Sequence, residues 1–169
     1  MAIAEQRGLA AVSMRSVAAR LGVTPMALYH HVRDKDDLLD GLVERLLAEL
    51  PIPDRELSWD ERLSQMARSL RDTAARHPDV FLMLLRRPVM TPAARRTRDA
   101  VYDALRDGGV SEEQIPRVER LLSTLVIGFA ASEAGGRFAM HDQRLLDGDI
   151  EAALQGVFAA VERLATQTP

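Results

Sequence analysis

The feature that most constrains the fold is the stretch of residues 13–32, which predicts two short helices joined by a tight turn. Ser13 is a suitable N-cap. The apolar residues after it recur at helical spacing, at Met14, Val17, Ala18 and Leu21. Gly22 stands where the end of a helix favours a left-handed residue. Thr24 and Pro25 then restart a helix, as N-cap and first helical residue, and this helix can extend to about residue 31 or 32. The pattern predicts a helix-turn-helix unit.

Helical spacing also dominates the rest of the chain. A third helix opens at Asp34 or Lys35, carries a stripe of leucines and stops at Pro51 and Pro53. Ser58 with Glu61 and Ser111 with Gln114 are candidate capping boxes. The pattern predicts further helices over about residues 58–76, 91–105, 111–137 and 149–165, with a short apolar segment at 80–85.

No run of alternating β-branched residues bounded by turns predicts a strand. We therefore expect an all-α fold in two parts. Residues 1–50 form an N-terminal helix-turn-helix domain of three helices, and residues 54–169 form a larger C-terminal helical bundle.

The composition of the chain limits its expected cellular location and the kinds of site it can form. The 169-residue chain has no cysteine, which excludes disulfides and thiolate metal sites. No apolar run approaches the roughly 20 residues that span a bilayer, and Met1–Ala10 lacks the layout of a signal peptide. We expect a cytoplasmic protein without membrane contact. The net charge is −3, yet residues 7–35 carry five cations and one anion, so a local basic face is compatible with an acidic chain.

The second helix of the pair has a composition suited to a nucleic-acid surface. Leu28 and Val32 supply its inner side, whereas Met26, Tyr29 and His30 lie on other faces. In a helix-turn-helix the second helix enters the DNA major groove, and phosphates accept hydrogen bonds from groups such as a tyrosine hydroxyl or an imidazole N–H. The alternative is that Tyr29 and one histidine cap the core of a small domain.

Residues 8–40 closely resemble the DNA-binding domain of the tetracycline-repressor (TetR) family. The most specific parts are 18–23, the run Leu28-Tyr29-His30-His31-Val32, and Lys35 followed by Leu38-Leu39. The resemblance extends over about residues 3–50, and the remainder resembles the C-terminal domain of that family in the number and length of its helices. It implies a homodimeric, ligand-responsive transcriptional repressor that binds a double-stranded DNA operator.

The resemblance also implies which residues contact DNA. They lie at the start of the first motif helix, on the recognition helix and at the start of the next helix: Ser13, Met14, Arg15, Thr24, Pro25, Met26, Tyr29, His30, His31 and Lys35. Arg15 could read guanine with two hydrogen bonds, and Pro25 and Met26 could contact thymine methyl groups. Lys35 matches a phosphate-binding lysine. His30 stands where the family often has a larger ring, which leaves its partner open.

One departure from the family pattern concerns the first helix. The family has a full first helix preceded by a basic arm, whereas only Met1–Arg7 precedes Gly8 here, which is under two helical turns. Either this helix is shortened or residues before it are left out of the sequence.

The sequence offers little support for an enzyme, a metal site or a cofactor. It contains no HExxH, P-loop or nucleophile-elbow motif. His30 and His31 are adjacent, so on a helix they point about 100° apart and cannot share a metal. His77 suits either a helix end or a ligand pocket, and Glu133 suits either a rim position or a buried site that needs a partner. The rival to a repressor is a helical enzyme or small-molecule carrier that keeps the N-terminal domain as a scaffold.

The middle helices are expected to enclose a small-molecule effector, because bundles bind ligands between facing helices. The candidate pocket residues are mainly apolar, which predicts a mostly apolar effector: Met66, Leu70, His77, Phe81, Leu84, Leu85, Arg86, Tyr102, Phe129 and Ser132. The alternative, which is the commoner case for such residues, is that each belongs to the core.

The last two long helices have apolar stripes wide enough to pack against a second copy of the chain. The candidate dimer residues are Val118, Leu122, Leu125, Phe129, Leu154, Val157 and Val161. The alternative is that these stripes form the ordinary core of a single chain.

Overall fold

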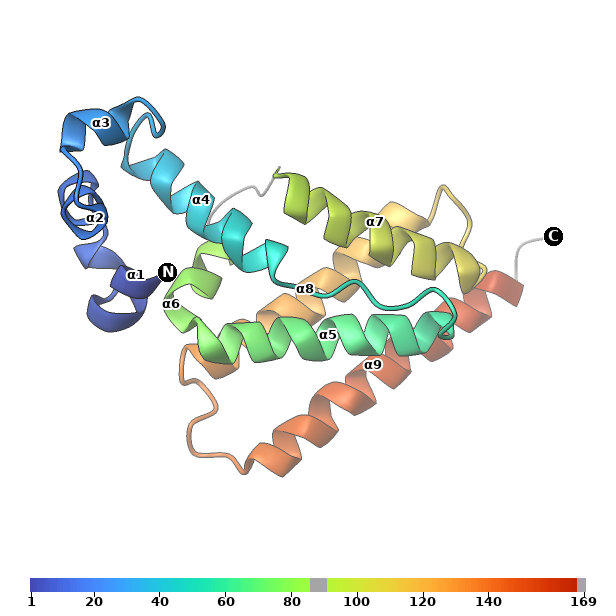
Figure 1. Ribbon diagram of the computed structural model, residues 1–169. Coiled ribbons are helices and arrows are strands. Elements are labelled where there is room, and N and C mark those ends of the chain that lie inside the picture. Colours follow the sequence, from blue (N-terminus) through green and yellow to red (C-terminus); the bar gives the residue numbers. More distant parts are fainter. Residues whose placement is uncertain (86–90, 167–169) are drawn as a thin grey trace.

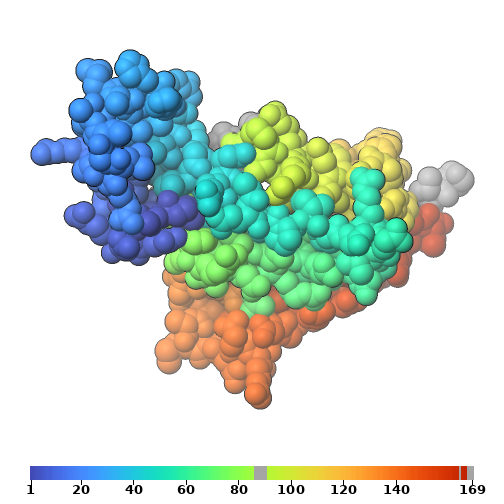
Figure 2. All heavy atoms as spheres, viewed as in Figure 1, coloured from blue at the N-terminus to red at the C-terminus, as the bar shows by residue number. Residues whose placement is uncertain are grey.

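The computed structural model describes residues 1–85 and 91–166, and it confirms the all-α prediction: no strand occurs among these residues. The N-terminal part contains α1 (Ala2–Arg7), the 3₁₀ turn η1 (Leu9–Ala11), α2 (Met14–Leu21), α3 (Pro25–Tyr29) and α4 (Lys35–Ala48). Figure 1 shows α1–α3 gathered at one end of the molecule, with α4 leading from them to the other helices. In Figure 2 the N-terminal helices stand out from the remainder as a lobe.

The remaining helices form the bundle. They are α5 (Trp59–Arg76), the short α6 (Pro78–Phe81) with the 3₁₀ turn η2 (Leu82–Leu85), α7 (Pro92–Asp107), α8 (Ile115–Ala134) and α9 (Gln143–Thr166). Helix α8 packs against α5, α7 and α9. Its inner stripe is therefore buried in the core of the bundle, together with Leu63, Leu105 and Phe158.

The local signals of the helix-turn-helix are confirmed. The Ser13 hydroxyl accepts a hydrogen bond from the Ser16 backbone N–H at 3.1 Å, and Thr24 Oγ1 accepts one from the Ala27 N–H at 3.2 Å. Gly22 has φ of 70° and ψ of 26°, the left-handed conformation. It lets the chain turn sharply between α2 and α3.

Three predicted boundaries in the bundle are wrong, and the recognition helix ends at Tyr29, earlier than predicted. The α8 helix begins at Ile115, not Ser111, because the Ser111 carbonyl accepts the N–H groups of Gln114 and Ile115 in a separate turn. It ends at Ala134, before the positive-φ residue Gly136. The α9 helix begins six residues earlier than residue 149, at Gln143.

The N-terminal helices and the bundle share buried surface. A small cluster of Met14, Ala18 and Leu28 joins α2 to α3. A larger cluster includes Ala4 of α1, Leu46 of α4 and Phe81 of α6. Helix α4 is consequently packed at both ends, and its position depends on the bundle as well as on the N-terminal lobe.

Candidate nucleic-acid interface and ligand pocket

The recognition helix α3 presents its side chains outward. Leu28 is 8% exposed and belongs to the small cluster, whereas Met26 is 71% and Tyr29 is 51% exposed. Helix α3 ends at Tyr29, and His30 and His31 follow it in an exposed turn rather than on the helix itself. The exposed side of α3 can therefore contact a DNA groove without any rearrangement of the core.

Among the predicted DNA contacts at the start of α2, only part lies on this surface. Arg15 is exposed. Met14 is 8% exposed and packs with Ala18 and Leu28, so its side chain has little surface to offer DNA. The reason is its position on the inner side of α2, facing α3. Ser13 is half-buried, and its hydroxyl also bonds to Ser16 Oγ at 3.0 Å.

The start of α4 is fixed relative to the recognition helix. The Asp34 carboxylate accepts the Asp37 N–H at 2.8 Å as an N-cap. Asp37 in turn accepts the backbone N–H of Arg33 at 2.9 Å and pairs with the Arg33 guanidinium at 3.3 Å. The hydrogen bond from the Arg33 backbone, followed by that from its side chain, lowers the pKa of the Asp37 carboxyl below its ordinary value. These contacts place exposed Lys35 next to the turn after α3.

A second feature is a partly open cavity of about 300 Å³ lined by residues of α5, α7, α8, η2 and the end of α4. Of the predicted pocket residues, Met66, Leu70 and Leu84 line it. Other apolar lining residues are Leu47, Leu50, Leu63, Ala67, Ala94, Val101, Leu122, Val126 and Ile127. Thr97, Arg98, Glu119 and Ser123 add polar groups to its wall. Sequence reasoning missed Arg98 and Glu119, because charged residues on an amphipathic helix resemble a solvent face.

The other predicted pocket residues lie elsewhere. His77 stands at the joint between the two parts of the chain, with Nδ1 3.0 Å from Glu5 Oε1 and Nε2 3.9 Å from Glu49 Oε2. Phe81 is fully buried in the larger core cluster, and Leu85 is 57% exposed. Arg86 lies outside the described residues.

Two aromatic residues and one serine among the predicted pocket residues have partners within the bundle. Tyr102 and Phe129 pack against its buried core. The centroid of the Phe129 ring also lies 5.5 Å from the centroid of the Phe138 ring. The Ser132 hydroxyl donates to the Gly128 carbonyl one turn earlier, at 2.8 Å.

Glu133 has a partner within the chain. Its Oε1 accepts from Arg71 Nη2 at 2.7 Å, and Arg71 also pairs with Asp147 at 2.8 Å. The hydrogen bond to Glu133 raises the pKa of the Arg71 guanidinium. The network connects α5, α8 and α9, so Glu133 needs no ligand cation for its charge.

Neither a metal site nor a membrane span emerges from residues 1–85 and 91–166. These residues contain no group of three or more side chains placed to hold a metal ion. Likewise, none of the helices in this part of the chain combines the length and apolar character needed to cross a bilayer.

Much of the predicted dimer face is already buried within the chain. Val118, Leu122, Leu154 and Val161 are at most 7% exposed and belong to the bundle core, because α8 packs against α5, α7 and α9, and α9 packs against α5 and α8. These four side chains therefore have little surface to offer a partner. Leu125, Phe129 and Val157 remain partly exposed. The large exposed apolar side chains on α8 and α9 are Leu121 at 64% and Leu145 at 63%.

Comparison with known families accounts for both parts of the chain. The family of bacterial regulatory proteins, tetR family, matches residues 1–42, and the tetracyclin repressor-like C-terminal domain matches residues 52–166. The chain belongs to the TetR family.

Curated relatives of this TetR-family chain are transcriptional regulators. The transcriptional repressor DrrR1 of Streptomyces coeruleorubidus is 32% identical over 133 residues, which are 78% of this chain and 49% of the relative. A transcriptional regulator of Saccharopolyspora erythraea is 29% identical over 131 residues, 77% of this chain and 56% of its own. The chain thus spans about half the length of the curated relatives it matches.

Solved structures share the whole arrangement. Apo ActR from Streptomyces coelicolor has a TM-score of 0.82 at 26% identity, covering 98% of this chain and 92% of its own. The same protein in complex with actinorhodin scores 0.82 at 27% identity, with 97% and 93% covered. BioQ with its double-stranded DNA operator scores 0.77 at 25% identity, with 95% and 92% covered.

Proposed function

We propose that this chain is a ligand-responsive DNA-binding transcriptional repressor. It holds a palindromic operator until a small, mostly apolar molecule enters the bundle. The observation that carries the proposal is the outward-facing helix α3, anchored by buried Leu28. A similar structure, BioQ, is bound to its operator. The chain acts by binding, without a catalytic group, and in the cytoplasm, where a bacterial chromosome lies.

The proposed division of labour follows the two parts of the chain, residues 1–50 and 54–169. Helix α3 enters the major groove with Tyr29 and Met26 outward, since a helix fits that groove. Arg15 and Lys35 flank it as cations toward bases and phosphates. The effector occupies the 300 Å³ cavity, whose size lies at the lower end of ligand pockets.

Helix α4 is the proposed link between the cavity and the recognition helix. Both Glu44 carboxylate oxygens accept the Ala93 N–H at the start of α7, at 3.2 Å each. Arg96 of α7 donates to the carbonyls of Ala48 and Leu50, at 3.1 and 3.0 Å. A ligand that displaces α7 therefore pulls on α4 and moves α3. The ligand shifts the equilibrium between the operator-binding conformation and the released conformation only by its difference in affinity for the two. Such coupling is typically about 1–3 kcal/mol.

We further propose that two copies pair through α8 and α9. The proposed face comprises exposed Leu121 and Leu145 and the small residues Gly128, Gly148 and Gly156. A Cβ added at any of these three glycines would meet no atom within 4 Å, so helices of a second copy could approach closely. A twofold pair would present its recognition helices to half-sites about 34–36 Å apart, or a multiple of that.

Selection from a pool of random DNA duplexes with the full chain tests the proposal. A repressor of this kind enriches one palindrome, and its affinity for that sequence falls steeply as salt rises. Enrichment of no sequence over repeated rounds would contradict the proposal. It would favour the rival function, a helical enzyme or carrier with the N-terminal lobe as a scaffold.

A further inference from the structure

A second hollow lies beside the apolar cavity. It is a groove of about 500 Å³ between the segment after α4, the start of α5 and one side of α7. Figure 1 shows this segment running between α5 and α7. Four arginines and two aspartates line the groove: Arg55, Arg62, Arg95, Arg96, Asp99 and Asp103. Its wall therefore carries an excess of positive charge.

Arg62 is the unusual member of this wall. It is 5% exposed, and its Nη2 lies 2.5 Å from Asp107 Oδ2. Its buried Nε has no hydrogen-bond partner among the described residues. A guanidinium carries five N–H donors, and a buried cation with unsatisfied donors is costly. Arg62 consequently brings to the wall of the groove a cation with one donor that the described part of the chain leaves unused.

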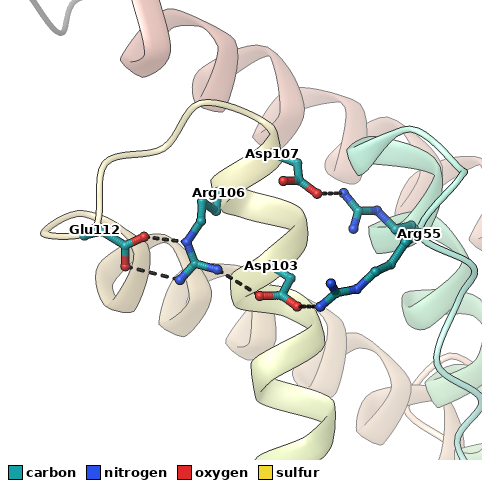
Figure 3. A network of polar contacts seen from close by, with 6 residues as sticks. Arg55, Asp103, Arg106, Asp107 and Glu112 are labelled. Carbon is teal, nitrogen blue, oxygen red and sulfur yellow. Dashed lines mark hydrogen bonds and ion pairs between the residues drawn. The ribbon is translucent and has the colours of Figure 1, made fainter.

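The neighbouring charges are unequally engaged. Asp103 of α7 pairs with both Arg55 and Arg106, as Figure 3 shows. Asp107 of the same helix pairs with Arg62. Both carboxylates are thus already compensated by cations. Arg95 is exposed and forms no ion pair with the described part of the chain. Three cations and one carboxylate of the groove are not fully engaged by these ion pairs: Arg95, Arg96, which donates only to carbonyls among the described residues, the incompletely bonded Arg62, and Asp99. The cations outnumber the carboxylate, so the groove keeps a net positive charge for an anion.

The groove and the apolar cavity are neighbours. Met66 lines both of them, and their other lining residues come from adjacent positions on the same segments: Leu50 and Pro51 beside Ile52, and Ala94 beside Arg95. Methionine is flexible and adapts to irregular ligands. A molecule that occupies the cavity could therefore extend past Met66 into the groove.

We propose that the effector is a small amphipathic acid, whose apolar body fills the cavity and whose acidic group binds Arg62 and Arg95. This inference rests on the proposed function and specifies the ligand class. Guanidinium groups favour carboxylate and phosphate oxygens alike, because both accept paired hydrogen bonds. The shared chemistry is an anionic oxygen group at the end of an apolar molecule.

Calorimetric titration of the full chain, without DNA, tests this inference with decanoate, decyl phosphate and decan-1-ol below their micellar concentrations. Decanoate or decyl phosphate should bind roughly tenfold more tightly than decan-1-ol, the effect of one charged hydrogen-bonding site. Whichever of the two binds more tightly identifies the acidic group. Equal affinity for the alcohol and both acids, or no binding of either acid, would overturn the inference.

Three single-charge variants assign the preference to residues. Arg62→Gln and Arg95→Gln should each remove most of the preference for the acid while leaving decan-1-ol binding unchanged. Arg68→Gln is the matched control, since Arg68 is an exposed arginine of the same helix α5 outside the groove and pairs with Glu151. Arg95 is exposed, so its variant remains decisive if Arg62→Gln folds poorly. A preference that survives in Arg95→Gln contradicts the proposal.

The duplex selection separates the two levels of the proposal. If the chain enriches a palindrome but shows no preference for the acid, the proposed ligand class is wrong and the repressor function stands. If the chain prefers the acid but enriches no DNA sequence, the proposed repressor function is wrong and the acid-binding site stands.

Discussion

At the scale of single residues, the recognition helix shows how neighbours in sequence take opposite roles. Leu28 is 8% exposed and Tyr29 is 51% exposed, although they are adjacent on α3. A helix rotates by about 100° per residue, so one side chain enters the cluster with Met14 and Ala18 while the next faces outward. Burial thus separates the residue that holds the helix from the residue that is free to touch DNA.

The first prediction concerns Tyr29. Tyr29→Ala should weaken binding to the selected palindrome, because it removes an exposed hydroxyl donor and ring, and should leave the melting temperature almost unchanged. Fluorescence anisotropy and thermal unfolding measure the two effects. Leu28→Ala is the contrasting variant and should destabilise the fold by about 2–5 kcal/mol. A large drop in the stability of Tyr29→Ala would instead favour a role in the core.

The second prediction concerns Lys35. Lys35→Ala should weaken binding to all duplexes alike and reduce the slope of log affinity against log salt by about one unit, as for one lost phosphate contact. Titrations at several salt concentrations, on the selected palindrome and on an unrelated duplex, measure this. Arg45→Ala on the same helix is the control, since Arg45 pairs with Glu49 far from α3 and should leave the slope unchanged. A change of sequence preference at constant slope would refute the phosphate assignment.

At the scale of elements, the turn between α2 and α3 depends on backbone conformation more than on packing. Gly22 has φ of +70°, and a Cβ added there would meet no atom within 4 Å. The constraint at this position is therefore the left-handed backbone itself. Gly41, inside α4, has equally open space for a Cβ but is a helical residue. The two glycines make a matched pair for separating conformation from contact.

The third prediction uses this pair. Gly22→Ala should destabilise the protein by about 1–2 kcal/mol, the penalty for an L-residue in the left-handed region. Gly41→Ala should stabilise it by about 1 kcal/mol, the gain in helix propensity over glycine. Denaturant unfolding of the three proteins measures both signs. If both variants shift stability in the same direction, the turn is not limited by its backbone conformation.

At the scale of the whole molecule, the proposed switch requires two copies held at a fixed spacing. The exposed leucines of α8 and α9 are the largest apolar groups on the proposed face. The core residues Leu122 and Leu154 cannot serve there, because each chain already buries them. Pairing therefore depends on residues that contribute little to the fold of one chain.

The fourth prediction tests that pairing. Leu121→Glu should convert the dimer to monomers and abolish tight binding to the full palindrome, because like charges placed across an interface cost several kcal/mol. Sedimentation velocity and anisotropy on the same samples measure both. Ala75→Glu, an exposed position on α5, is the control and should change neither. If the Leu121→Glu protein remains dimeric, the interface lies elsewhere. If it is a monomer that still binds the full palindrome tightly, operator binding does not require two paired recognition helices.

The local elements of this protein were readable from its sequence. Ser13, Gly22 and Thr24 act on backbone groups within a few residues, so their type and position suffice to predict where α2 ends and α3 begins. The absence of strand patterns likewise predicted the all-α fold. The predicted start of α8 at Ser111 is wrong because the Ser111 carbonyl accepts the N–H groups of Gln114 and Ile115 in a separate turn before the helix.

Only the tertiary structure decided which charged and apolar residues meet. Arg62 pairs with Asp107, 45 residues away, and Arg71 with Glu133, 62 residues away. His77 meets Glu5 of α1, whereas the sequence suggested a role at a helix end or, as the alternative, in a ligand pocket. Apolar periodicity reports that a helix has a buried side, but the same stripe forms a core, a cavity wall or a dimer face. The distinction depends on which helices pack against it, and that is a property of the assembled fold.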